Sequence, residues 1–71
     1  MGKLSEHQKN SIQNYKGMIE QTKLSIQNQR SALASARSRK DQGSIAACNS
    51  AIEQFKRDIQ TYKAHIASIK G

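Results

Sequence analysis

Lysine or arginine occupies every seventh position in two stretches of this 71-residue sequence. The positions are Lys9, Lys16, Lys23, Arg30 and Arg37 in the first half, and Lys56, Lys63 and Lys70 in the second. We call these eight residues the basic edge. Ammonium and guanidinium groups bind phosphates and carboxylates through charge and hydrogen bonds. Their regular spacing therefore indicates a surface that binds polyanions.

The residues that could perform catalysis or hold a metal are few and far apart. The single cysteine, Cys48, lies more than four turns from His65 along one expected helix, whereas a thiol nucleophile needs a base within hydrogen-bond reach. His7 and His65 are expected on different faces as solvated residues, without further ligands to complete a metal site. The acids are expected to be scattered outward and unpaired. We predict a protein that is not an enzyme and that uses no metal or cofactor.

Residues spaced alternately by three and four, all apolar except Thr22 and Gln29, define the elements that position the cations. In the first half this seam comprises Ile12, Tyr15, Ile19, Thr22, Ile26, Gln29, Leu33 and Ala36. In the second half it comprises Ile45, Cys48, Ile52, Phe55, Ile59, Tyr62, Ile66 and Ile69. This heptad pattern is typical of coiled-coil helices. The sequence therefore predicts an all-α fold of two helices.

A short polar stretch at residues 39–44 separates the two seams and predicts a turn. We expect residues 1–71 to form one domain, an antiparallel hairpin with helices at about 5–39 and 44–70 and a turn at about 40–43. Pairing Ala36 with Ile45 then aligns all eight seam positions without a slip. Such a hairpin buries little apolar area, so we expect it to assemble into a four-helix bundle or a larger homo-oligomer.

The helix ends carry recognisable capping residues. Ser5 and Gln8 have the spacing of a capping box, which predicts that the first helix starts near Ser5. Gly43 is expected to adopt the left-handed conformation in the turn. Ser44 is then expected to cap the second helix.

The hairpin should separate two kinds of flank. We label the seam residues of each helix alternately a and d, starting with a at Ile12 and Ile45, so that the basic edge occupies the e positions. In an antiparallel pair the e positions of one helix face the e positions of the other, so the cations of both helices converge on one flank. The opposite flank carries the g positions, which are Ser11, Met18, Ser25, Ala32, Ser44, Ala51, Asp58 and His65. Another copy is expected to pack there and on exposed apolar residues nearby. The predicted oligomer interface comprises Met18, Leu24, Ala32 and Ala51.

The net charge of +7 favours a polyanionic partner. Our leading hypothesis is binding of nucleic-acid phosphates by the basic edge, with little sequence preference. One alternative is an interaction module, such as a phage- or plasmid-type inhibitor or assembly adaptor, that docks on an acidic protein or sequesters a small anion such as a nucleotide. The structural alternative is that the lysines only lay their methylenes over the seam.

Hydropathy and cysteine content indicate where the protein works. The sequence contains no apolar run of about twenty residues, so no membrane span is expected. Cys48 falls on the buried seam and is expected to be reduced. We therefore predict a cytoplasmic protein.

Overall fold

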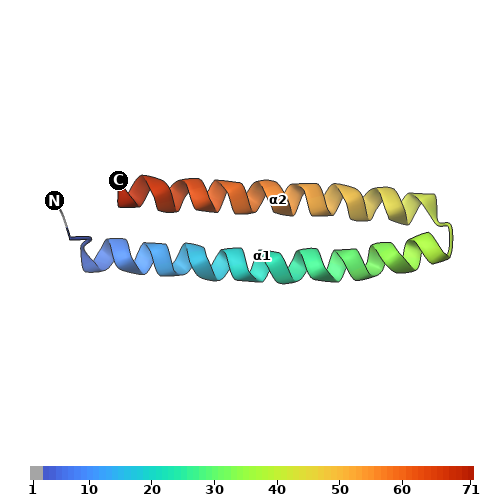
Figure 1. Cartoon of the computed structure of the whole chain (residues 1–71), viewed down its shortest axis with the longest axis horizontal. Helices are drawn as coiled ribbons and strands as arrows, with labels where there is room; N and C mark the ends of the chain where they lie inside the picture. Colours follow the sequence, from blue (N-terminus) through green and yellow to red (C-terminus); the bar gives the residue numbers. More distant parts are fainter. Residues whose placement is uncertain (1–2) are drawn as a thin grey trace.

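The computed structural model describes residues 3–71, which form two long helices and no strand. Helix α1 spans Glu6–Ser38 and helix α2 spans Gln42–Lys70. They lie side by side and antiparallel in a rod 56 Å long, with the start of α1 and the end of α2 at the same end of the rod (Figure 1). The predicted helical hairpin is therefore confirmed. Met1 and Gly2, which the predicted domain includes, lie outside the described residues.

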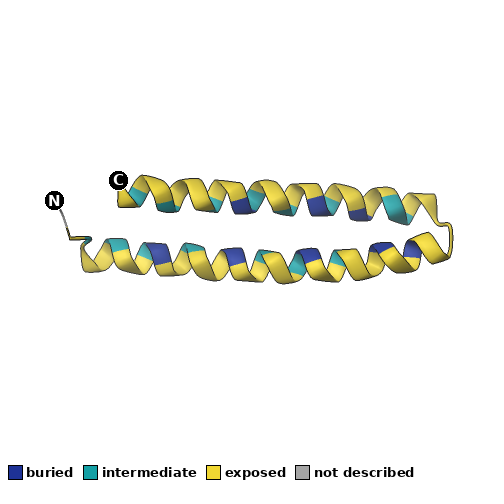
Figure 2. Cartoon of the chain, viewed as in Figure 1, coloured by how far each residue is buried: buried dark blue, intermediate teal, exposed yellow. Residues whose placement is uncertain are grey.

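The seam residues form the contact between the helices. All sixteen predicted seam residues are buried or half-buried, and most of the remaining surface is exposed (Figure 2). The most buried are Ile12, Ile19, Ile26, Leu33, Ala36, Cys48, Ile52 and Ile59. The heptad pattern thus identified the inward face of each helix.

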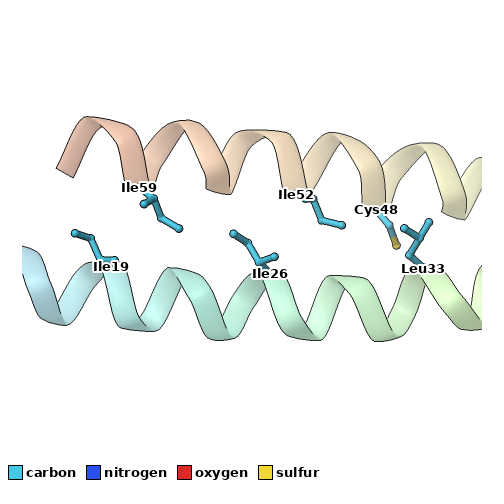
Figure 3. Close-up of a cluster of buried hydrophobic side chains, with 6 residues drawn as sticks. All are labelled: Ile19, Ile26, Leu33, Cys48, Ile52 and Ile59. Atoms are coloured by element: carbon cyan, nitrogen blue, oxygen red, sulfur yellow. The ribbon is translucent and has the colours of Figure 1, made fainter. Parts of the chain in front are cut away.

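The alignment of the two helices agrees with the predicted register. Cys48 lies opposite Leu33, and Ile26 lies between Ile52 and Ile59 (Figure 3). These positions follow from pairing Ala36 with Ile45 and continuing along both helices. The seam therefore runs without a slip through the described cluster.

The start of α1 confirms the predicted capping box. The Ser5 hydroxyl accepts a hydrogen bond from the Gln8 amide at 3.1 Å, and the Gln8 side-chain oxygen accepts one from the Ser5 amide at 2.8 Å. Two amides that have no partner within the helix are thereby satisfied.

The turn differs from the prediction in two residues. Lys40, not Gly43, adopts the left-handed conformation, with φ of 56°. The Lys40 amide donates to the Arg37 carbonyl at 3.1 Å and the Asp41 amide donates to the Ala36 carbonyl at 2.9 Å. This bonding pattern is that of a Schellman cap, which needs a left-handed residue directly after the helix cap. Because α1 ends at Ser38, Gly43 lies too far along the chain to take that place.

The cap of α2 is Asp41, not Ser44 as predicted, because α2 begins at Gln42. Its carboxylate accepts hydrogen bonds from the Ser44 amide at 3.2 Å and the Ser44 hydroxyl at 2.7 Å. These bonds hold the pKa of Asp41 below its ordinary value of 3.8, the hydroxyl bond contributing most. Gly43 lies inside the first turn of α2.

Neither helix within residues 3–71 combines the length and hydrophobicity needed to cross a bilayer.

Candidate functional site

The basic edge is exposed along the whole length of the hairpin. All eight of its cations are solvent-exposed side chains on α1 or α2. At the open end of the rod, Lys9 and Lys16 of α1 and Lys70 of α2 line one hollow of about 280 Å³. Leu4, Ile12 and Gln13 complete its lining. Cations from the two helices therefore meet on one flank there, as the e-position geometry predicts.

Two similar hollows lie farther along the basic edge, one on each helix. On α1, Lys23 and Arg30 flank Ile26 and Gln27 around a hollow of about 410 Å³. The second, on α2, is lined by Glu53, Lys56, Arg57, Ile59, Gln60 and Thr61 and holds about 520 Å³. In all three hollows an isoleucine three residues after a cation forms part of the lining, followed by glutamine. The pattern arises because an a position adjoins the e positions of its own helix.

Two carboxylates interrupt the positive charge. Glu20 lies 3.8 Å from the Lys23 ammonium, and Glu53 lies 3.9 Å from that of Lys56. The expectation of unpaired acids concerned pairs of carboxylates, and these two ion pairs with lysine were not predicted from the sequence. The pairs are well exposed, so each contributes little to stability. A repeated Ile-Glu-Gln-X-Lys sequence at residues 19–23 and 52–56 could have indicated them, since residues three apart on a helix are neighbours.

Arg57 is a further cation that the seven-residue spacing did not identify. It lies one position beyond Lys56 and lines two hollows on α2, in each case together with Glu53. This arginine extends the positive surface of α2 from the basic edge onto the outer face of the helix. The strict heptad spacing missed it because f positions point away from the partner helix.

The opposite flank carries aromatic side chains. The Tyr15 ring stacks on the His65 ring of α2, with ring centroids 5.2 Å apart and planes inclined by 13°. Its centroid also lies 6.1 Å from that of Tyr62. His65 is exposed, as predicted, but it contacts the other helix rather than water alone. The register already places Tyr15 level with Ile66, so the contact with its neighbour His65 could have been anticipated.

The four residues of the predicted oligomer interface do not lie on one surface. Met18 is 43% exposed and occupies a g position, as do Ala32 and Ala51. Leu24 is 53% exposed but lines the hollow with Lys23 and Arg30 on the other side of α1. Leu24 is at an f position, which lies about 100° around the helix from a g position, so its side chain is separated from that of Met18.

Among residues 3–71 no three His, Cys, Asp or Glu side chains are close enough together to hold a metal ion. Cys48 is a free, buried thiol on the seam.

No protein-family model matches the chain, and neither a curated protein nor a solved structure is significantly similar to it. The basic edge and the opposite flank, which carries Tyr15, Tyr62 and His65, are the two surfaces from which we infer a function.

Proposed function

We propose that this protein binds polyanions, foremost nucleic-acid phosphates, through the basic edge. The observation that supports this most directly is the hollow in which Lys9, Lys16 and Lys70 meet from both helices. Like charges gathered on one flank repel one another, so the arrangement disfavours folding at low salt unless an anion is bound. A purely structural flank would more commonly alternate lysine with glutamate.

The dimensions of the edge suit contact with a phosphate backbone. Seven residues of helix span about 10.5 Å, so successive cations follow the rod at that interval. From Lys9 to Arg37 the stripe extends about 42 Å, the length of roughly a dozen base pairs. Lysine and arginine side chains at this spacing neutralise phosphates without reading base edges. The expected binding is therefore salt-sensitive and tolerant of sequence.

A second candidate function is capture of a small anionic ligand such as a nucleotide. The hollow at the open end combines three ammonium groups, the Gln13 amide and an apolar lining that includes Leu4 and Ile12. Docking on an acidic protein would use the same charges, and it is the third candidate. Both alternatives predict binding that saturates at one partner per site and does not depend on nucleic-acid length.

Self-association is the second part of the proposal. The hairpin exposes 5301 Å². A compact monomer of 7.9 kDa exposes about 4,400 Å², so the excess is about 900 Å². This excess is close to the roughly 800 Å² that each partner buries in a stable protein interface. We therefore propose a dimer as the smallest functional unit.

The test compares two variants of equal charge. One replaces four cations of the basic edge with glutamine: Lys16, Lys23, Lys56 and Lys63. The control replaces the four cations outside it: Lys3, Arg39, Lys40 and Arg57. Glutamine is a good helix former, so both variants should keep the helical circular dichroism of the wild type.

Binding is measured by fluorescence anisotropy with a labelled duplex over a range of salt concentrations. For each phosphate that a variant no longer neutralises, the slope of log affinity against log salt should fall by about 0.9, or about 0.7 for a single strand. The basic-edge variant should neutralise several phosphates fewer than the wild type, and the control at most one fewer. Equal changes in both variants would mean that only net charge matters. No binding by the wild type at physiological salt would refute the nucleic-acid proposal and leave the small anion and the acidic protein to be tested.

A further inference from the structure

The two sides of the seam are covered to different degrees. In a coiled-coil helix the a positions adjoin the e positions, and the d positions adjoin the g positions. The a residues Ile12, Ile19 and Ile26, which adjoin the basic edge, are 6–8% exposed. The d residues Tyr15, Phe55 and Tyr62 are only half-buried. On their side of the seam no long lysine or arginine side chain occupies the g positions of α1 or α2.

We define the aromatic flank as Tyr15, Met18, Phe55, Tyr62 and His65. The stacking of Tyr15 on His65 shows that this tyrosine ring leans outward towards the g positions. Met18 adds an apolar side chain that is 43% exposed. This flank therefore exposes part of the hydrophobic seam that the hairpin alone does not cover.

Charge distinguishes the aromatic flank from the basic edge. None of the g positions of α1 or α2 carries a lysine or arginine, and Asp58 is their only carboxylate. A second copy with a net charge of +7 can approach this flank while its own cations remain on the far side. An acidic partner would find no complementary charge there. The aromatic flank thus suits a second copy of this chain.

We propose that two hairpins pack through their aromatic flanks and that the dimer joins two separate nucleic-acid segments. A two-fold interface brings the same flank of each copy into contact. The two basic edges then lie on opposite outer faces of the dimer. A straight duplex bound to one edge cannot reach the other, so the second edge is free to bind another duplex. The joining activity rests on the proposed binding of nucleic acid by the basic edge, whereas the dimer interface does not.

The dimer is tested with a matched pair of variants in analytical ultracentrifugation. Met18→Glu places a carboxylate on the aromatic flank, and Ser31→Glu makes the same charge change at an exposed position of α1 that belongs neither to this flank nor to the hollows of the basic edge. We expect the wild type to sediment as a dimer at micromolar concentration. Met18→Glu should weaken the dimer at least tenfold, and Ser31→Glu should change it by less than about twofold. A monomeric wild type, or equal weakening by both variants, would overturn the proposed interface.

The joining activity is tested by immobilising one biotinylated duplex and measuring capture of a second, fluorescent duplex. Both variants are used at concentrations that saturate a single duplex, because each adds one negative charge. Wild type and Ser31→Glu should capture the second duplex, whereas Met18→Glu should bind the first duplex and lose the capture.

Two negative outcomes are distinguishable. A wild-type dimer that binds one duplex but captures no second one would refute the joining activity and leave polyanion binding intact. A wild type that binds no duplex at all would refute the proposed function and the joining with it, and the sedimentation data would still decide whether the aromatic flank is the dimer interface.

Discussion

The two flanks of the hairpin are built on the same heptad and nevertheless differ in how well they cover the seam. On the basic edge, Lys23 and Arg30 line a hollow together with Ile26, which is 8% exposed. On the aromatic flank, which has no lysine or arginine at its g positions, Phe55 and Tyr62 are half-buried. We therefore expect a charged residue with a long aliphatic stem to cover the seam better than a shorter side chain does. Burial in a two-helix rod is decided by the neighbours of the seam as much as by the seam itself.

The largest expected effect is the loss of folding stability when a seam side chain is truncated to alanine, and this loss should differ between the two flanks. Ile26→Ala should cost about 3 kcal/mol at any protein concentration, because its surroundings are complete within one hairpin. Phe55→Ala removes a larger side chain but should cost only about 2 kcal/mol when the hairpin is alone. In the dimer the loss of stability caused by Phe55→Ala should rise to about 3–4 kcal/mol, because the ring is then covered by the second copy.

Urea titrations at several protein concentrations measure both costs. A Gly17→Ala background keeps the weaker variants folded, since nothing lies within 4 Å of the added methyl and alanine stabilises a helix interior by about 1 kcal/mol over glycine. A Phe55→Ala cost that is independent of concentration would show that no second copy covers this ring.

A smaller effect tests whether lysine stems cover the seam. Lys16 lines the hollow that contains Ile12. Lys16→Met keeps the stem and removes the charge, so its stability should equal or slightly exceed that of the wild type. Lys16→Ala uncovers Ile12 and should be about 0.5 kcal/mol less stable than Lys16→Met, despite the better helix propensity of alanine. Thermal melts of the two variants compare them directly, and equal stability would mean that the stem covers nothing.

The pairing of two acids with the basic edge gives a third prediction. Replacing Glu20 and Glu53 with glutamine frees Lys23 and Lys56 for phosphate. Each exposed pair is worth about 0.2–0.5 kcal/mol, so the double variant should bind a duplex about two- to fivefold more tightly at low salt. Anisotropy titrations at low and high salt provide the measurement. Because salt screens exposed charges, a gain that persists unchanged at high salt would contradict this explanation.

The smallest effect concerns the turn, which belongs to neither flank. The folded pKa of Asp41 is lowered by its bonds to Ser44, so its stabilising contribution is present above the unfolded pKa, near 3.8. The contribution is lost as the pH falls through the lower folded pKa. Asp41→Asn keeps a capping oxygen and removes the titration.

Melting temperatures of wild type and Asp41→Asn should therefore differ most near neutral pH and converge in acid. The remaining acids are common to both proteins and cancel in the difference. A difference that stays constant from neutral pH to below about pH 3 would show that the Asp41 carboxylate is not stabilised in its charged form.

Most of the fold could be predicted from the sequence because the heptad is a repeated signal. All sixteen seam residues agree with the hydrophobic pattern, and a slip of one position would have exposed most of them. The cap at Ser5 was also predictable, since serine and glutamine at that spacing satisfy each other's amides. The positions of the cations on one flank follow from the same repeat.

The turn was harder to predict because alternative caps and alternative left-handed residues are close in free energy. Asp41 and Ser44 are both good caps, and a start at Gln42 adds helical residues to α2. A left-handed lysine costs roughly 1–2 kcal/mol, and the two hydrogen bonds of the cap offset that cost. The heptad also assigns Leu24 to the outside without showing which cations it lies beside.

The position of the chain ends gives the rod a direction. The start of α1 and the end of α2 lie together, and the turn lies at the far end of the 56 Å rod (Figure 1). Two rods paired about a two-fold axis are therefore either parallel, with both turns at one end, or antiparallel, with the turns at opposite ends. Dyes attached at Gly71 of each copy would be close together in the first arrangement and about 56 Å apart in the second. Energy transfer between labelled copies would thus reveal the orientation of the assembly.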